Sequence, residues 1–316
     1  YMRKIFRRTL MTLLIVMSLL TAAIVGAAIQ TFDGKGEWHT SDAENQQIAM
    51  ARASQRAQFD AQKKAGVALK NFSRSINSEL ADDAVSAVVN NIIQVSDVKI
   101  VPIPFEANGE AGIMYKATLK ATIDTDGIYA WLKRDDKEKI AIIQQNDNLQ
   151  DAIQKNDELA EKLTEQYNRA TSQAEKDRIR KQMNDADRDF LANQKLEEGN
   201  KICYDGVGYD GVGDYKRAIK LYNEAIALKP DYAEAYISLA KVYSSLRQYE
   251  LALANCNKAI EIEPFAKNYI YRTWLGNESS DLALADYNKA IELEPSAKNY
   301  IRRAMFYDWS GKTKLA

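Results

Sequence analysis

The pattern of hydrophobic and polar positions changes its period several times along the chain, and each period predicts a different kind of element. The first regular stretch covers residues 30–39, where Phe32, Gly34, Gly36 and Trp38 occupy every second position. A period of two places alternate side chains on opposite faces and is typical of a strand. The sequence therefore predicts that the ordered part of the chain opens with a strand.

A second alternating stretch covers residues 113–124 and predicts another strand. Its apolar face consists of Ile113, Tyr115, Ala117, Leu119, Ala121 and Ile123. Residues 98–105 also favour a strand, but Pro102 and Pro104 cannot donate to a neighbouring strand, so this strand is expected at a sheet edge. Between the two, residues 107–110 read ANGE, a hairpin turn signal.

Two helices are predicted between the first strand and this hairpin. Residues 41–44, SDAE, match a capping box, so we expect the first helix to start there. Its apolar stripe advances by three and four residues and consists of Met50, Ala53, Ala57, Ala61, Ala65 and Ala68. A second helix is expected over residues 79–93. The order β-α-α-β-β predicts an α+β domain over residues 29–133, with both helices on one face of an antiparallel sheet.

Residues 134–196 are rich in charged and amide side chains and contain neither Gly nor Pro. They predict a charged helical stalk with a heptad seam, formed by Leu149, Ile153, Asn156, Ala160, Leu163, Tyr167, Ala170 and Ala174. The phase then breaks, and a second short seam follows at Ile179, Met183, Ala186 and Phe190. An antiparallel hairpin with a turn near Thr171, one long coiled-coil helix that dimerises, and a solvated linker helix all fit this pattern.

Residues 197–316 contain an internal repeat. The segments YKRAIKLYNEAIALKP, YELALANCNKAIEIEP and SDLALADYNKAIELEP align, and their closing prolines, Pro230, Pro264 and Pro295, are 34 and 31 residues apart. This period, with small residues where two helices cross, resembles tetratricopeptide repeats. The third unit is three residues short, so its first helix or its turn is expected to be short. The resemblance covers about three and a half units, the last truncated at Ala316, so we expect either that the natural chain continues or that another chain covers this end.

Tetratricopeptide repeats form an α-solenoid, and the resemblance implies a concave groove lined by the first helix of each unit. The candidate peptide-binding residues are Ile237, Lys241, Ile270, Tyr271, Trp274, Lys298, Ile301, Arg302 and Met305. Lys298 and Arg302 resemble half of the carboxylate clamp of chaperone-binding family members, whereas Ile237 and Tyr271 stand where the other half would lie. A mixed apolar and basic groove and a purely structural array are the other two interpretations.

The first 28 residues combine a basic start, Arg3 to Arg8, with an apolar run of about 16 residues. This predicts either a cleaved signal peptide or a retained membrane anchor over residues 1–28. The remainder would then be exported, to the periplasm or the cell envelope, with an inner-membrane anchor if the segment is kept. A lipid anchor is excluded because no Cys follows the run.

The α+β domain also resembles a known type of domain. The strand GKGEW, the helix AMARASQRAQFDAQKKAG and the late strand ending in ATIDTD resemble LPP20-like lipoproteins and the N-terminal domain of flagellar assembly protein T. The resemblance implies an envelope interaction domain without known chemistry.

Composition argues against an enzyme. The chain of 316 residues contains a single His, His39, which excludes multi-His metal sites, while the net charge of −1 offers no basic face for nucleic acid. Gly206, Gly208 and Gly211 spell a dinucleotide-binding fingerprint, but helices are predicted on both sides, so an enlarged turn is expected instead. No catalytic residue, metal or cofactor is predicted, and the two cysteines are expected to pack within helices.

These patterns favour a non-enzymatic scaffold or adaptor that binds a protein or peptide segment in its repeat groove. The alternative is a structural subunit of a surface layer, filament or envelope assembly that self-associates through the stalk and the open solenoid end.

Overall fold

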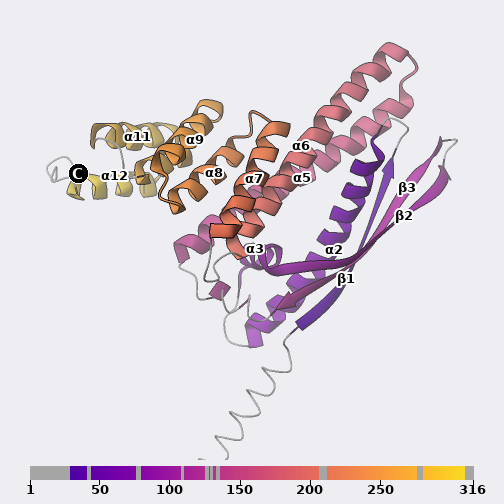
Figure 1. Cartoon of the computed structure of the whole chain (residues 1–316), viewed down its shortest axis with the longest axis horizontal. Helices are drawn as coiled ribbons and strands as arrows, with labels where there is room; N and C mark the ends of the chain where they lie inside the picture. The colour runs from indigo at the N-terminus through magenta and orange to yellow at the C-terminus, as the bar shows by residue number, and fades with distance from the viewer. Residues whose placement is uncertain are drawn as a thin grey trace, which may run out of the picture. The chain divides into compact units, whose positions relative to one another are not determined.

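The computed structural model of the chain describes residues 29–40, 44–75, 80–107, 110–124, 128, 131–132, 136–205, 212–275 and 280–309. The chain divides into two compact units, residues 1–184 and 185–316 (Figure 1). The N-terminal unit holds a sheet with helices, and the C-terminal unit is a helical array. The predicted signal or anchor, residues 1–28, lies outside the described residues.

The N-terminal unit is built on three antiparallel strands in the order β1-β3-β2. Their bounds are Ile29–Thr40 for β1, Ile93–Ala107 for β2 and Glu110–Asp124 for β3. The proline-bearing strand β2 lies at an edge, as predicted. The alternation in β3 is confirmed, because Tyr115, Ala117, Leu119, Ala121 and Ile123 are all buried.

Helix α2, Gln46–Ser75, covers one face of this sheet (Figure 1). Its alanines at positions 53, 57, 61 and 65 are fully buried, as the stripe predicts. The glycines of β1 allow an unusually close approach: a Cβ at Gly34 would lie 2.1 Å from the carbonyl oxygen of Ala57, and one at Gly36 would lie 2.3 Å from that of Ala53. The GKG motif is therefore a packing motif, because only a residue without a side chain fits under this helix.

The predicted start of α2 is wrong by a few residues. The helix begins at Gln46, where the side chain of Asn45 accepts a hydrogen bond from the backbone N–H of Gln47 at 2.8 Å. Glu44, expected to close a capping box, instead accepts the indole N–H of Trp38 at 2.8 and 3.1 Å. A buried Trp needs a partner for its N–H, and this tertiary contact takes precedence over the local cap.

Among the described residues, three further long helices belong to the N-terminal unit. They are α3, Asp82–Ile92, then α5, Asp136–Arg169, and the first part of α6, Gln173–Asp205. The break between α5 and α6 lies at the turn predicted near Thr171. Most of the predicted seam is buried, at Leu149, Ile153, Asn156, Ala160, Leu163, Ala170, Ile179, Met183, Ala186 and Phe190, whereas Ala174 is exposed. A separate stalk remains a prediction.

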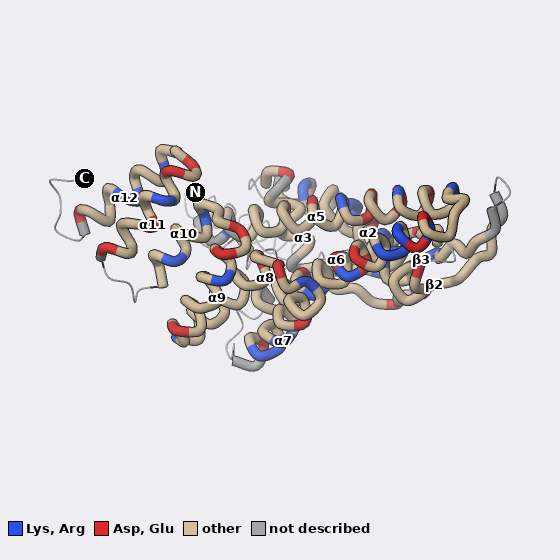
Figure 2. The backbone as a smooth tube through the Cα atoms, turned by 90° about the horizontal axis from the view of Figure 1, so that it is seen from above, with Lys and Arg blue, Asp and Glu red and all other residues tan. Residues whose placement is uncertain are grey.

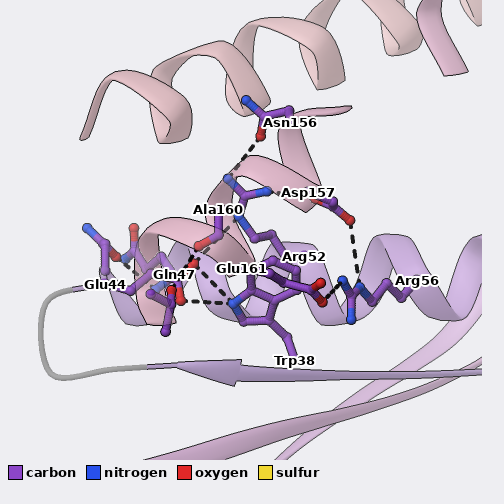
Figure 3. Close-up of polar contacts among 11 residues, drawn as sticks. Trp38, Glu44, Gln47, Arg52, Arg56, Asn156, Asp157, Ala160 and Glu161 are labelled. Atoms are coloured by element: carbon purple, nitrogen blue, oxygen red, sulfur yellow. Dashed lines mark hydrogen bonds and ion pairs between the residues drawn. The ribbon is translucent and has the colours of Figure 1, made fainter. Parts of the chain in front are cut away.

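A buried ionic network joins α2 to α5 (Figure 3). The guanidinium of Arg52 contacts Asp157 at 2.6 Å, Asn156 at 3.0 Å and Glu44 at 3.5 Å. Arg56 extends the network, because it contacts Asp157 at 3.6 Å and Glu161 at 2.5 Å. Both guanidinium groups also lie over the Trp38 ring, at 5.0 and 4.4 Å from its centre. This network attaches α5 to the layer formed by α2 and the sheet.

One buried side chain of α2 has no matching partner. Gln55 is 5% exposed, and both its amide oxygen and its amide nitrogen lack a hydrogen-bond partner among the described residues. An unpaired buried polar group costs about 1–3 kcal/mol. We therefore expect Gln55→Met, which keeps the length of the side chain, to raise the free energy of unfolding by about 1–2 kcal/mol.

Urea unfolding followed by circular dichroism measures this change. The matched control is Gln144→Met on the exposed side of α5, which should change stability by less than about 0.5 kcal/mol. A loss of stability in Gln55→Met would show instead that the amide is satisfied in solution, for example by an ordered water.

In the described part of the C-terminal unit, the end of α6 is followed by six helices, and from α7 onward each helix packs against the next. Their bounds are Val212–Leu228 for α7, Ala233–Ser245 for α8, Tyr249–Ile262 for α9, Ala266–Trp274 for α10, Ser280–Leu293 for α11 and Ala297–Trp309 for α12. Ala218, Ala225, Ala240, Ala252 and Ala259 are fully buried at the helix crossings. At nine residues, α10 confirms the expected short first helix of the third unit.

Polar bonds also connect successive repeats. Arg272 on α10 binds Asp286 on α11 with two bonds of 2.6 and 2.8 Å, and binds Asn257 on α9 at 2.6 Å. The equivalent Arg303 on α12 binds Asn288 on α11 at 2.7 Å. Each arginine therefore ties a first helix to the second helix of the preceding unit.

The glycine-rich segment predicted as an enlarged turn, Gly206–Gly211, falls outside the described residues. Helices flank it on both sides, as predicted. None of the helices in the described ranges is long and apolar enough to cross a membrane.

Candidate peptide-binding surface on the repeats

The nine candidate groove residues come from the first helices α8, α10 and α12, and the structure separates them by burial. Ile237 belongs to the core between α8 and α9, together with Ala240, Ala252 and Cys256. Ile270 belongs to the next core, with Tyr287 and Ala290. These two isoleucines hold the repeats together and offer almost no surface to a ligand.

Lys241 and Tyr271 are half-buried. Burial lowers the pKa of Lys241, while the nearby carboxylate of Glu234 opposes that shift. Burial raises the pKa of Tyr271 to about 12, although a hydrogen bond with Ser244 works in the opposite direction. At neutral pH the Tyr271 hydroxyl therefore stays neutral and can donate or accept a hydrogen bond.

The remaining predicted residues gather at the end of α10 and on α12. Trp274, Ile301 and Met305 are 62%, 58% and 67% exposed, which is unusual for large apolar side chains. The guanidinium of Arg302 lies over the Trp274 ring, 5.7 Å from its centre. Lys298 is exposed one turn before Arg302. We call these five residues the Trp274–Arg302 surface.

Helical geometry explains why these side chains lie together. On α12, positions 298, 301, 302 and 305 are three or four residues apart along one face. The cation–π contact then places this face beside the last residue of α10. The result is an exposed apolar surface with two cationic side chains, and lysine and arginine positions are visible on both helices (Figure 2).

The sequence analysis did not select Lys267, which bridges the first helices of two units. Its ammonium group binds the carboxylate of Glu234 on α8 at 3.0 Å. The repeat could have indicated Lys267 as a candidate, because Lys267 and Lys298 occupy the same position in the two AKNY segments. Lys267 differs from Lys298 in being paired, so Lys298 is the more available cation of the two.

The surface contains groups that bind rather than groups that react. Aromatic, aliphatic and cationic side chains can take up apolar and acidic groups of a partner. Across the residues the structure describes, no group of three or more His, Cys, Asp or Glu could hold a metal ion. Neither cysteine forms a disulfide among the described residues; Cys256 is buried and Cys203 half-buried, and burial raises the pKa of the Cys203 thiol.

Comparison with protein families identifies the helical array. A "TPR repeat" family profile matches residues 212–246, and the "Tetratricopeptide repeat" profile matches residues 233–265. The chain therefore contains tetratricopeptide repeats, as the sequence period indicated. Such repeats present extended surfaces for protein–protein interaction. Both profile matches lie within the C-terminal unit, so the resemblance of the α+β domain to envelope domains stays a prediction.

Known proteins resemble this chain over the length of a few repeats. Sperm-associated antigen 1 of Rattus norvegicus is 32% identical over 82 residues, 26% of this chain and 8% of that protein. Stress-induced-phosphoprotein 1 of Caenorhabditis elegans is 35% identical over 95 residues, 29% of this chain and 28% of that protein. A solved structure, the first TPR of Spaghetti (RPAP3) bound to an HSP90 peptide, is 23% identical and covers 38% of this chain and 96% of its own, with a TM-score of 0.33. The chain thus matches less than a third of either curated relative.

The predicted localisation is wrong. The curated relatives come from rat, mouse, human and nematode, and animal cells have no periplasm. One of them is the mitochondrial import receptor subunit TOM70 of Rattus norvegicus, 28% identical over 102 residues, 31% of this chain and 17% of that protein. The prediction rested on the apolar run within residues 1–28, a pattern that identifies an apolar segment without specifying a compartment.

Proposed function

We propose that this protein is a non-enzymatic adaptor that binds a segment of another protein on the Trp274–Arg302 surface. The observation that supports this most directly is the exposure of Trp274, Ile301 and Met305 on adjoining first helices. Burying a side chain of this size on binding contributes about 1.5–3 kcal/mol. Trp and Arg are also the residue types that most often dominate binding energy at interfaces.

The charges favour an acidic partner segment. Arg272 is paired with Asp286 and Lys267 with Glu234, so these two cations are already engaged within the array. Lys298 is exposed, and the guanidinium of Arg302 lies over the Trp274 ring. In a partner segment that alternates apolar and acidic residues, the apolar residues would contact the apolar side chains of the surface, and the acidic residues would contact its cations.

The experiment is fluorescence anisotropy with two labelled peptides, one of alternating Leu and Glu and one in which Lys replaces Glu. The acidic peptide is expected to bind the full chain more tightly than the basic one. Arg302→Glu should weaken acidic-peptide binding at least tenfold, which corresponds to about 1.4 kcal/mol, and Trp274→Ala should do the same through lost contact area.

Leu282→Ala is the matched control, because Leu282 is also an exposed apolar residue, at 43%, but lies on the second helix α11. This variant should bind like the unmodified protein. Equal affinity of all variants for the acidic peptide would reject the surface. Light scattering on the same samples distinguishes the alternative function, because a structural subunit that self-associates would form concentration-dependent polymers without added peptide.

The α+β part of the N-terminal unit fits a second module of such an adaptor. Its resemblance to small interaction domains concerns the GKGEW strand and the alanine-spaced helix, which the fold uses for close packing. We propose that it is a second interaction module, carried on the same chain as the repeats.

A further inference from the structure

Among the strands that the structure describes, β1 lies at an edge of the sheet and pairs only with β3. In an antiparallel strand, alternate residues direct their backbone N–H and C=O groups to opposite sides. An unpaired edge of this kind is a template for pairing with another chain. The outward groups of Asp33, Lys35 and Glu37 belong to this free edge of β1.

Three side chains of α2 bind three of these groups. The ammonium of Lys64 donates to the carbonyl oxygen of Asp33 at 2.7 Å. The backbone N–H of Lys35 donates to the carboxylate of Asp60 at 3.0 Å. The guanidinium of Arg56 donates to the carbonyl oxygen of Glu37 at 3.2 Å.

The match depends on spacing and on charge order. Positions 56, 60 and 64 advance along the helix by about 6 Å per step, and positions 37, 35 and 33 advance along the strand by about 6.7 Å per step. Three contacts can therefore stay in register. A cation contacts the carbonyls of Asp33 and Glu37, and an anion contacts the Lys35 N–H between them, so the order of charges on α2 complements the order of these three groups on β1.

The glycines of β1 make this arrangement possible. With glycine at positions 34 and 36, α2 can lie so close to β1 that a Cβ at either position would clash with its backbone. At this short separation the side chain of Asp60 reaches the strand. Asp60 and Lys64 also bind each other at 2.6 Å, which holds two of the three side chains in place.

We propose that Arg56, Asp60 and Lys64 form a guard that closes the β1 edge against extended segments of other polypeptide chains. The segment that the edge would otherwise accept is another copy of the β1 sequence. In antiparallel pairing centred on Gly36, Lys35 of each strand faces Glu37 of the other, so two pairs of solvent-facing side chains are opposite in charge. The guard thus protects the sheet from strand addition by identical, incompletely folded chains.

The test uses a fluorescein-labelled peptide of residues 30–40, QTFDGKGEWHT, and the full chain carrying Asp60→Ala with Lys64→Ala. The control carries Asp151→Ala with Lys155→Ala, which removes an exposed i, i+4 ion pair of the same chemistry on α5, also at 2.6 Å. Fluorescence anisotropy should show at least tenfold tighter peptide binding to the guard variant than to the control or the unmodified protein. A peptide carrying Asp33→Lys and Glu37→Lys should lose this gain.

Equal peptide binding by the guard variant, the control and the unmodified protein, with native helix content in all three, would overturn the proposal. If the double variant loses its helical circular dichroism, Lys64→Ala alone is measured instead, because it opens the Asp33 carbonyl and leaves Asp60 in place. The single variant should then bind the peptide more tightly than Lys155→Ala, and a failure to do so would overturn the proposal equally.

Discussion

Gly36→Val is expected to unfold the N-terminal unit or to destabilise it severely. Its Cβ would lie 2.3 Å from both the carbonyl oxygen of Ala53 and the backbone nitrogen of Ala57. These are backbone atoms in the middle of α2, so they cannot move aside without lifting the whole helix from the sheet. Overpacking of this kind costs about 3 kcal/mol or more, a large part of the 5–15 kcal/mol that separates a typical folded domain from its unfolded state.

Chemical denaturation followed by far-UV circular dichroism measures the effect. Gly66→Ala on α2 is the matched control, because there the new Cβ would meet only a side-chain methyl of Val85 at 3.3 Å. Since alanine favours helix over glycine by about 1 kcal/mol, this control should be neutral or slightly stabilising. A Gly36→Val protein as stable as the control would mean that α2 does not approach β1 this closely.

Arg52→Met should have the second largest effect, a loss of about 3–5 kcal/mol in the free energy of unfolding. The fully buried guanidinium of Arg52 holds Asp157, Asn156 and Glu44 together. Removing it leaves the Asp157 and Glu44 carboxylates buried without this cation. Arg188→Met removes an exposed arginine of α6 and should change stability by less than about 0.5 kcal/mol.

The loss in Arg52→Met should depend on pH. Burial already raises the pKa of Asp157, while Arg52 and Arg56 oppose that shift, so removal of Arg52 should raise the pKa further. A carboxyl whose pKa is higher in the folded state takes up a proton on folding, and stability then rises as the pH falls towards that pKa. Urea unfolding should therefore show a smaller loss at pH 5 than at pH 7.5.

A second change should rescue the variant. Adding Asp157→Leu to Arg52→Met removes the Asp157 carboxylate, which has lost its Arg52 partner. This should restore much of the stability, because an apolar pair can replace a buried ion pair. An equal loss at both pH values and no rescue would indicate that Arg52 contributes through packing alone.

The parts of the fold that follow from the sequence are those with local repetition. The spacing of Pro230, Pro264 and Pro295 identified the repeats, since each unit is a local helix pair that stacks on an almost identical neighbour. The alternation of apolar residues predicted β3, because a strand buried on one face has an apolar residue at every second position. The prolines of β2 predicted its place at a sheet edge.

The parts that could not be predicted depend on contacts between distant residues. Arg52 and Asp157 are 105 positions apart, and no local pattern marks either as buried. Glu44 satisfied a helix-cap pattern in sequence but is used by Trp38. Among the predicted surface residues, the sequence pattern could not separate Ile237 and Ile270, which the repeat buries, from Ile301, which it leaves exposed.

The arginine bonds between repeats have a consequence for how the array comes apart. At nine residues, α10 is too short to stay helical by itself, yet Arg272 fastens it to the helix before it and the helix after it. Melting α11 would break the bonds between Arg272 on α10 and Asp286. It would also break the bond between Arg303 on α12 and Asn288. The stretch from α9 to α12 should consequently open as one cooperative block, so that a ligand bound to the Trp274–Arg302 surface on α10 and α12 also stabilises α9, which it does not contact.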